Sequence, residues 1–239
     1  MIIYGINPVT EALQSQTNRP DHVWIAKGGS NARLQEIAQL AKRHQVPVRF
    51  ESSQAIAKKT KTRDHQDVAA EMSRVGYVAF RDLIATQPAL LLLVDGVEDP
   101  RNLGALLRTA EATGVKGILI PNRRSCPITP TVVKASAGGA IHLKISRIVN
   151  VVQALEKLKS QGYWVVGLDM QGENSVDEID AGDLTVVVLG GEHQGLRKQV
   201  RKHCDFLISL PMQGQVSSLN LSVAAGVLLY ELVRKRLTS

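Results

Sequence analysis

The chain has 239 residues, 44% of them hydrophobic, and a formal net charge of +7. This length suffices for one large or two modest domains, and the hydrophobic content excludes a disordered chain. A basic balance attracts polyanions because each neutralised phosphate releases counterions, although many basic proteins carry such charge only for solubility.

The first 72 residues predict a small α/β unit. Asn7 followed by Pro8 is typical of a helix start, and Ser52 or Ser53 is expected to cap a short helix. The other elements expected here are a helix at residues 31–44 and strands at residues 22–26, 46–50 and 68–72. The amino-terminal stretch has no charged leader and is not expected to be a signal peptide.

A basic segment lies before the last strand of this unit. It consists of Lys58, Lys59, Lys61 and Arg63. These side chains are too polar for a core and too closely spaced for one helix face, so we expect them on a surface or loop. A solubilising patch is the competing interpretation of such a charge run.

Residues 73–88 are expected to be a linker with a short helix at 82–85, and strands then alternate with helices. The expected strands are residues 89–94, 115–120, 142–145, 163–168, 184–189 and 206–210. The expected helices are residues 103–113, 131–137, 151–161, 196–202 and 219–236. Near-continuous apolar strands separated by helices predict a parallel sheet covered on both faces.

Two further patterns limit the functional classes. Cys126 and Cys204 lack CxxC spacing, so they predict neither a disulfide framework nor a metal site, and we interpret them as thiols in a reducing compartment. The longest apolar run is far shorter than the roughly 20 residues that span a bilayer. The sequence thus predicts a cytoplasmic protein without a metal or a membrane partner.

The first motif is the segment 95–114. Asn102 is expected to cap the helix that follows a turn at Asp99. Gly104 costs a helix about 1 kcal/mol relative to alanine, which suggests that something approaches the backbone there. Arg108 points away from the apolar face, beside Glu111, and a solvated pair of these two is the simplest interpretation.

The second motif is LGGEHQGL at residues 189–196. An apolar strand ends there in Gly190 and Gly191, followed by Glu192. Ligands of parallel sheets bind where loops leave the carboxyl ends of strands, and two glycines would let a ligand reach the backbone. An ordinary strand-to-helix turn is the alternative.

The third motif is PMQGQVSSLNLSVAAG at residues 211–226. Ser217, Ser218 and Asn220 stand at the head of a long apolar helix. One serine would suffice as a cap, so this is more polarity than capping needs.

Together these motifs resemble the TrmH-like ribose 2′-O-methyltransferases of the SPOUT class. Asn102, Gly104 and Arg108 match the family's N-x-G-x-x-x-R segment, and the other two motifs match L-G-x-E-x-x-G-L and P-M-x-G-x-x-x-S-L-N-x-S-V-A-A-G. The N-terminal part resembles the small L30e-like RNA-binding domain of the bacterial 23S ribosomal RNA guanosine methyltransferases. The resemblance covers nearly the whole chain. One departure is Asp67, where the family has glycine after His-Gln.

The resemblance implies a C-terminal SPOUT domain at residues 89–239 with a trefoil knot that binds S-adenosylmethionine. The backbone groups implied in cofactor binding are those of Leu189, Gly190, Gly191, Leu210, Met212 and Leu219. The catalytic residues implied are Arg108, Asn102, Glu192, Ser218 and Asn220. A homodimer is implied as well, with the RNA site assembled across its interface.

The implied reaction is methylation of a ribose 2′-hydroxyl, most directly on a guanosine of 23S ribosomal RNA. By the same resemblance the basic segment would contact RNA phosphates, with Arg123, Arg124 and Lys134 as the alternative footprint. Transfer RNA is the alternative substrate, and a non-catalytic RNA-binding protein is the alternative class. A nicotinamide oxidoreductase would require the G-x-G-x-x-G fingerprint, which the sequence lacks.

Overall fold

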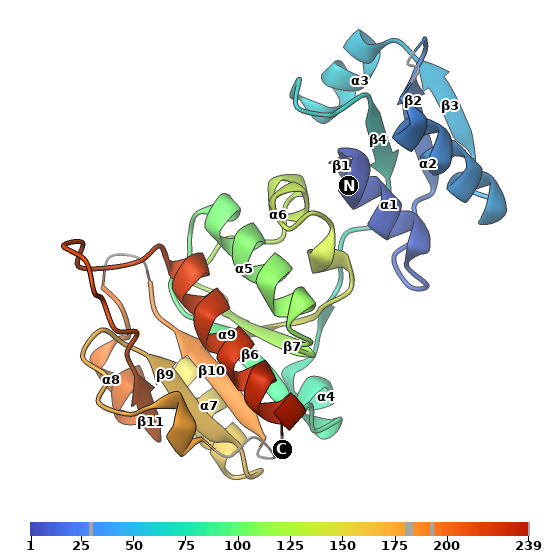
Figure 1. The fold of residues 1–239 in the computed structure, drawn as a ribbon. Coiled ribbons are helices and arrows are strands. Elements are labelled where there is room, and N and C mark those ends of the chain that lie inside the picture. The colour runs from blue at the N-terminus through green and yellow to red at the C-terminus, as the bar shows by residue number, and fades with distance from the viewer. Residues whose placement is uncertain (29–30, 180–183, 192–193, 239) are drawn as a thin grey trace. The chain divides into compact units, whose positions relative to one another are not determined.

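The computed structural model describes residues 1–28, 31–179, 184–191 and 194–238 (Figure 1). It divides into two compact units. Unit 1 comprises Met1–Val75 and Ile128–His142, and unit 2 comprises Gly76–Pro127 and Leu143–Ser239. This division differs from the ranges expected from the sequence, because residues 128–142 pack with the N-terminal unit.

Unit 1 is built on a four-stranded sheet in the order β1-β4-β2-β3. Its elements are β1 (Ile2–Tyr4), α1 (Ile6–Gln14), β2 (His22–Ala26), α2 (Ala32–Arg43), β3 (Val48–Glu51), α3 (Ser53–Thr60), β4 (Val68–Glu71), α6 (Pro130–Ala135) and the short helix η1 (Gly139–Ile141). Strand β2 pairs with β3 in parallel and with β4 antiparallel.

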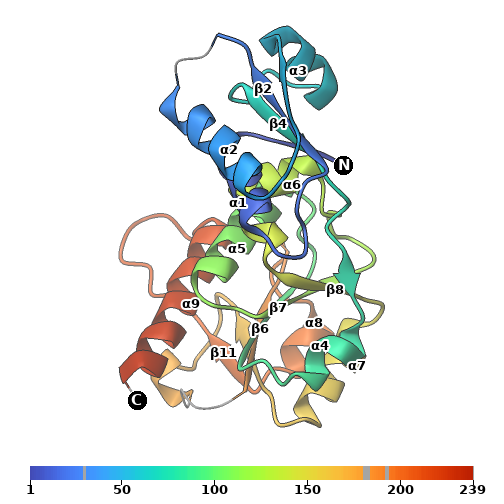
Figure 2. The ribbon, with the colours of Figure 1, turned by 90° about the vertical axis from the view of Figure 1, so that its right-hand side faces the viewer.

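The two faces of this sheet are covered by different helices. Ile56 of α3 packs against Trp24, Ala26 and Ala69, while α2 buries Leu34, Ile37 and Ala41. Figure 2 shows α2 and α3 on opposite sides of the strands. The helix predicted after Ser52 begins as expected, since Ser52 Oγ accepts from the N–H of Ala55 at 3.2 Å.

The predicted start of α1 is wrong by two residues. The helix begins at Ile6 with Gly5 as its N-cap, and the Asn7 side chain makes no capping bond. Instead Asn7 Oδ1 accepts from the Arg33 guanidinium at 3.1 Å. Gly5 has φ of +96°, a backbone conformation that favours glycine and that lets the chain turn directly from β1 into the helix.

Unit 2 contains a seven-stranded sheet in the order β11-β9-β10-β6-β7-β8-β5. Its strands are β5 (Tyr77–Val78), β6 (Leu90–Val94), β7 (Gly117–Pro121), β8 (Lys144–Ile148), β9 (Trp164–Leu168), β10 (Thr185–Leu189) and β11 (Phe206–Ile208). All six pairings are parallel, which confirms the predicted sheet type. The segment expected as a linker, 73–88, contributes β5 to this sheet.

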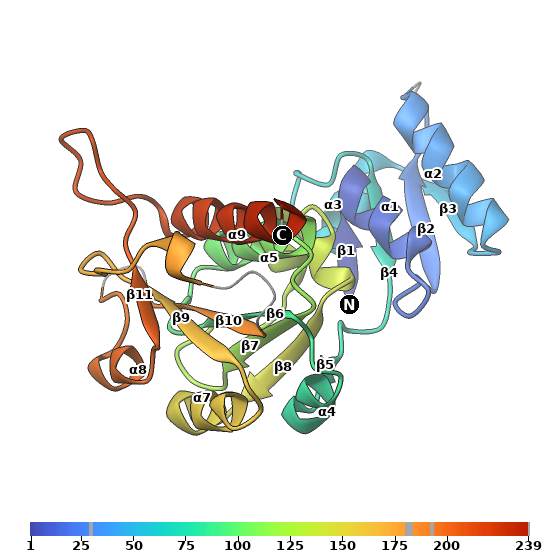
Figure 3. The same ribbon diagram turned by 60° about the horizontal axis from the view of Figure 1, so that its bottom comes forward.

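Helices cover both faces of this sheet, as predicted. They are α4 (Phe80–Ala85), α5 (Pro100–Ala112), α7 (Val151–Lys159), α8 (Lys198–Lys202) and α9 (Leu221–Thr238), with the short helix η2 (Val176–Glu178) between β9 and β10. Residues of α4, α7 and α8 share one apolar cluster with Leu91, Leu93 and Val186. Figure 3 shows α5 and α9 together on the opposite face. No helix in the described part of the chain is long and apolar enough to cross a membrane.

Candidate active site

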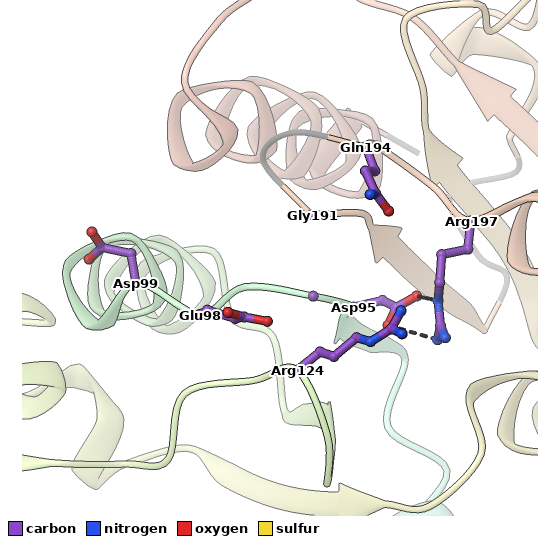
Figure 4. Close-up of a pocket in the computed structure, with 9 residues that line it drawn as sticks. Asp95, Glu98, Asp99, Arg124, Gly191, Gln194 and Arg197 are labelled. Atoms are coloured by element: carbon purple, nitrogen blue, oxygen red, sulfur yellow. Dashed lines mark hydrogen bonds and ion pairs between the residues drawn. The ribbon is translucent and has the colours of Figure 1, made fainter.

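A pocket lies where the chain leaves the carboxyl ends of β6 and β10. The two strands are parallel neighbours with Leu189 opposite Val94, so the loops that follow them start side by side. The pocket has a volume of about 560 Å³ and is lined by Asp95, Gly96, Glu98, Asp99, Arg124, Gly191, Gln194, Gly195 and Arg197 (Figure 4). This is the position at which parallel sheets bind ligands.

The glycines of this site bring backbone against backbone. A Cβ at Gly190 would lie 2.0 Å from the carbonyl carbon of Gly195, and one at Gly191 would lie 3.0 Å from the Gly96 oxygen. Gly96 itself has φ of +90°. The space beside Gly190 is therefore filled by the protein's own chain, whereas Gly191 also lines the pocket.

An ion pair between the buried Asp95 and the exposed Arg197, which the sequence did not predict, frames the pocket. Both carboxylate oxygens of Asp95 accept from Arg197, from Nε at 2.8 Å and from Nη2 at 2.9 Å. Asp95 is only 5% exposed, and its N–H also donates to the Leu189 carbonyl at 2.8 Å. This fork-to-fork contact ties the loop after β6 to the start of α8.

The predicted cap of α5 is wrong. The helix begins at Pro100, and Asp99 is its N-cap, with Oδ1 accepting from the N–H groups of Arg101 at 2.6 Å and Asn102 at 3.4 Å. Proline has no N–H and is therefore well suited to the first helical position, where an N–H would have no partner within the helix. Pro100 at this position favours the residue before it, Asp99, as the cap. Asn102 lies in the first turn instead.

At the head of α9 the capping bond is made by Asn220 and not by one of the serines. Helix α9 begins at Leu221, and Asn220 Oδ1 accepts from the N–H of Ser222 at 2.9 Å. Ser217 and Ser218 precede the helix and are exposed. The Asn220 amide nitrogen donates to Asn102 Oδ1 at 3.3 Å, which brings together two motifs 118 residues apart.

The five candidate catalytic residues thus meet only in part. Asn102 and Asn220 are in contact, and Glu192 lies outside the described residues. Arg108 is exposed on α5, roughly 9 Å along the helix axis from Asn102 at 1.5 Å per residue. No ion pair with Glu111 forms among the described residues. Neither Arg108 nor Ser218 lines the pocket.

The candidate cofactor residues fall on two segments. Leu189 and Gly190 are buried and Gly191 lines the pocket, while Leu210 and Met212 are half-buried and Leu219 is exposed. Between Leu210 and Leu219 no backbone hydrogen bond joins this segment to another described residue. Its N–H and C=O groups are therefore available to a ligand. The described residues contain no group of three metal-ligating side chains.

The basic segment of unit 1 is less uniform than the sequence suggested. Lys59 is half-buried, 3.5 Å from Glu51 and over the ring of Trp24 at 4.8 Å. Lys58, Lys61 and Arg63 are exposed and have no partner among the described residues. Only these three are free to meet an anion from solvent.

Asp67 occupies the position where the family resemblance leads us to expect glycine. Its φ is +60° and that of Gln66 is +53°, so this turn needs the left-handed conformation that glycine adopts without strain. The backbone N–H of Asp67 donates to His65 Nδ1 at 3.0 Å, as a glycine N–H could, and the Asp67 carboxylate adds a contact by accepting from Ser53 at 2.7 Å. The departure therefore keeps the turn.

The neighbouring Gln66 holds a further cation in unit 1. Its side-chain oxygen accepts from the Ile6 N–H at 3.2 Å and from Lys134 Nζ at 2.7 Å. Burial lowers the pKa of Lys134, which also lies over the Tyr4 ring. Lys134 is thus engaged within unit 1, whereas Arg124 lines the pocket of unit 2.

Comparisons with known proteins match both parts of the chain. Residues 89–230 match the SpoU rRNA methylase family, and residues 2–78 match the RNA 2′-O ribose methyltransferase substrate-binding domain. The chain is 39% identical to the 23S rRNA (guanosine-2′-O-)-methyltransferase RlmB of Pseudomonas putida, over 98% of this chain and 96% of that protein. It is 41% identical to RlmB of Xylella fastidiosa over the same shares.

Solved structures share the fold. The SpoU methyltransferase AviRb of Streptomyces viridochromogenes, crystallised with AdoMet, superposes with a TM-score of 0.81 at 22% identity and covers 100% of this chain and 91% of its own. At this identity the likeness concerns the fold, and it extends over both units.

Proposed function

The chain belongs to the SpoU rRNA methylase family, and we propose that it methylates the ribose 2′-hydroxyl of a guanosine in 23S ribosomal RNA. The observation that carries this proposal is the contact between Asn102 and Asn220. It joins the heads of α5 and α9, the two helices that carry the first and third motifs. A fold that only bound RNA would have no need for this convergence.

S-adenosylmethionine would supply the methyl group on a sulfonium, a leaving group that needs no protonation. Backbone groups of Leu210, Met212 and Leu219 would hold it, because their segment has no backbone partners among the residues described. Leu189 O and Gly191 O already accept from Asp95 and Gly195, so these two carbonyls are less available. Direct cofactor binding is tested by calorimetry on the full chain.

The chain's own residues have to position the 2′-hydroxyl and accept its proton. Arg108 is exposed, so it is free to contact a phosphate and the alkoxide that develops during the attack. Its guanidinium stays protonated in proteins, which makes it an electrostatic clamp rather than a base. Glu192 or an RNA phosphate oxygen would take the proton.

We further propose that the chain forms a homodimer through the α5–α9 face. A hollow of about 580 Å³ between these helices is lined by Thr109, Ser222, Val223, Gly226, Val227, Tyr230 and Glu231. Val223, Val227 and Tyr230 are 52%, 44% and 56% exposed, an apolar surface that a second copy would cover. Light scattering on Tyr230→Glu should give a folded monomer where the unaltered chain gives a dimer.

The proposal includes the assignment of parts: residues 1–72 recruit the RNA, residues 73–88 connect the parts and add β5 to the sheet, and residues 89–239 form the catalytic domain with its trefoil knot, apart from residues 128–142, which pack with unit 1. The match of residues 2–78 to a substrate-binding domain supports this assignment. A ribosomal RNA substrate would be met in the cytoplasm, and we propose that the protein acts there.

Mapping of 2′-O-methyl sites tests the function. Ribosomal and transfer RNA from cells lacking the gene would be compared with RNA from cells carrying it, and purified protein would then methylate a transcript of the affected helix. We expect one guanosine of 23S RNA to lose its methyl group. A lost site in transfer RNA alone would transfer the activity to that substrate, and no lost site would contradict the proposal.

A further inference from the structure

Three polar side chains of the pocket have no partner among the described residues: Glu98, Arg124 and Gln194. The other charged side chains of the pocket already have partners, since Asp95 pairs with Arg197 and Asp99 caps α5. In Figure 4 Arg124 reaches up from the loop after β7, Gln194 comes down from the opposite loop, and Asp99 lies apart on the helix. Glu98 and Arg124 thus share one pocket without forming an ion pair.

The loop that carries Arg124 is fixed at both ends within unit 2. The Asn122 carbonyl accepts from Arg147 at 3.0 Å, and the Cys126 N–H donates to the Val97 carbonyl at 3.0 Å. Between these anchors Arg124 adopts φ of +56°, uncommon for a side chain of this size. These anchors fix the loop backbone at Arg124, and its side chain lines the pocket.

Glu98 is exposed, so water solvates its carboxylate in the free protein, and its electrostatic effect begins when a ligand enters the pocket. The chain is basic, with a net charge of +7, and the proposed substrate is a polyanion. An unpaired carboxylate at the site of an incoming nucleotide repels its phosphates unless the ligand offers hydrogen-bond donors there. Carboxylate oxygens only accept, and the arginine fork only donates. The ligand that fits both must have adjacent donors on one side and adjacent acceptors on another.

Guanine is the base with this pattern. Its N7 and O6 accept side by side, a pair that arginine binds with two hydrogen bonds. Its N1–H and N2–H₂ donate side by side, and a carboxylate can accept from both. Adenine has an N6 donor where guanine has O6, so an arginine placed for guanine would face a donor. A volume of about 560 Å³ is ample for a single nucleobase.

We propose that this pocket receives the base of the target guanosine, with Arg124 contacting N7 and O6 and Glu98 contacting N1–H and N2–H₂. This rests on the proposed function and adds the residues that select the nucleotide. Enzymes that modify a nucleotide commonly turn it out of the stack and read its exposed edge, which such a pocket would allow. Glu98 and Arg124 are thereby specificity-determining residues for the methyl transfer.

Nucleobase analogues test each contact separately. The full chain would methylate transcripts carrying guanosine, inosine or 7-deazaguanosine at the mapped site; inosine lacks the N2 amino group and 7-deazaguanosine lacks N7. For the unaltered protein we expect each analogue to lower kcat/KM by about tenfold, the scale of a lost base contact. The Glu98→Ala variant should then have the same kcat/KM for guanosine and inosine transcripts and a lower kcat/KM for the 7-deazaguanosine transcript. Arg124→Met should show the opposite pattern.

Arg123→Met is the matched control, because Arg123 is exposed on the same loop and does not line the pocket. It should lower the rate on all three transcripts equally, if at all. Equal rates of the unaltered protein on guanosine and inosine would overturn the Glu98 contact. Discrimination that survives in both pocket variants would overturn the pocket as the base site. Absence of methylation with guanosine itself would instead contradict the proposed function.

Discussion

The ion pair between the buried Asp95 and the exposed Arg197 gives an asymmetric prediction for stability. Removing the guanidinium leaves a carboxylate that is 5% exposed without its partner, whereas removing the carboxylate leaves an arginine whose side chain is 45% exposed and can turn to water. We therefore expect Arg197→Ala to cost about 3–5 kcal/mol, the scale for an orphaned buried charge. Asp95→Ala should lower the free energy of unfolding by only about 1–2 kcal/mol, because water can replace the hydrogen bonds that the exposed Arg197 loses.

The double variant should lose about 1–2 kcal/mol, no more than Asp95→Ala alone. The buried carboxylate that has no partner in Arg197→Ala is absent from the double variant. The two tryptophans lie in different units, Trp24 in unit 1 and Trp164 in unit 2. Urea unfolding in a Trp24→Phe background, followed by fluorescence of Trp164, therefore reports on unit 2.

Arg201→Ala is the matched control on the same helix. Its contacts are with Gln171 at 2.8 Å and Asp169 at 3.9 Å, and its loss should cost less than about 1 kcal/mol. Equal losses in the two single variants of the pair, or additive losses in the double variant, would refute the reasoning. They would mean that Asp95 is solvated in solution.

Further outcomes follow from the site and from unit 1. Arg108→Ala should abolish methyl transfer and leave the cofactor affinity measured by calorimetry unchanged. Arg108→Lys should also lose most of its activity, because an ammonium lacks the planar fork of a guanidinium. Turnover by either variant would mean that Arg108 does not have this role. Neutralising the three exposed cations of the basic segment should reduce the salt slope of RNA binding by up to about three contacts, with Lys59→Gln alone leaving it unchanged. Asp67→Ala should lower the thermal midpoint of unfolding, because it loses the Ser53 contact and keeps the strained backbone. Asp67→Gly should leave the midpoint nearly unchanged, because the relief of strain offsets the lost contact. Burial raises the pKa of the Cys204 thiol to about 12, so a thiol reagent at pH 8 should label it only after unfolding.

The sequence predicted the elements that stand out as a continuous apolar run or as a helical period. The five-residue strands of unit 2 and helices such as α5 and α7 were expected within a few residues of their ends. Strands β1 and β5, with three and two residues, were not expected, because such lengths display no alternation. β5 lies in the segment taken as a linker, where only its pairing with β8 identifies it.

The capping errors have a different cause. The side chain of Asn102 could cap in principle, and so could Asp99 one turn earlier; Pro100 at the first helical position was the signal that favours Asp99. At the head of α9 the serines Ser217 and Ser218 are also competent caps, and the sequence does not indicate that Asn220 makes the bond to the Ser222 N–H. Single-residue boundaries depend on which of several competent side chains the tertiary structure leaves free.

The pocket's framework could not have been predicted, because it depends on contacts between distant residues. Asp95 and Arg197 are 102 residues apart, and neither stands in a spacing that suggests a partner. The glycines were recognised as positions of close approach, but glycine does not indicate what approaches. At Gly190 it is the backbone of Gly195, and at Gly191 it is that of Gly96. One wall of the pocket is thus made of packed main chain, which leaves the recognition of a ligand to the side chains around it.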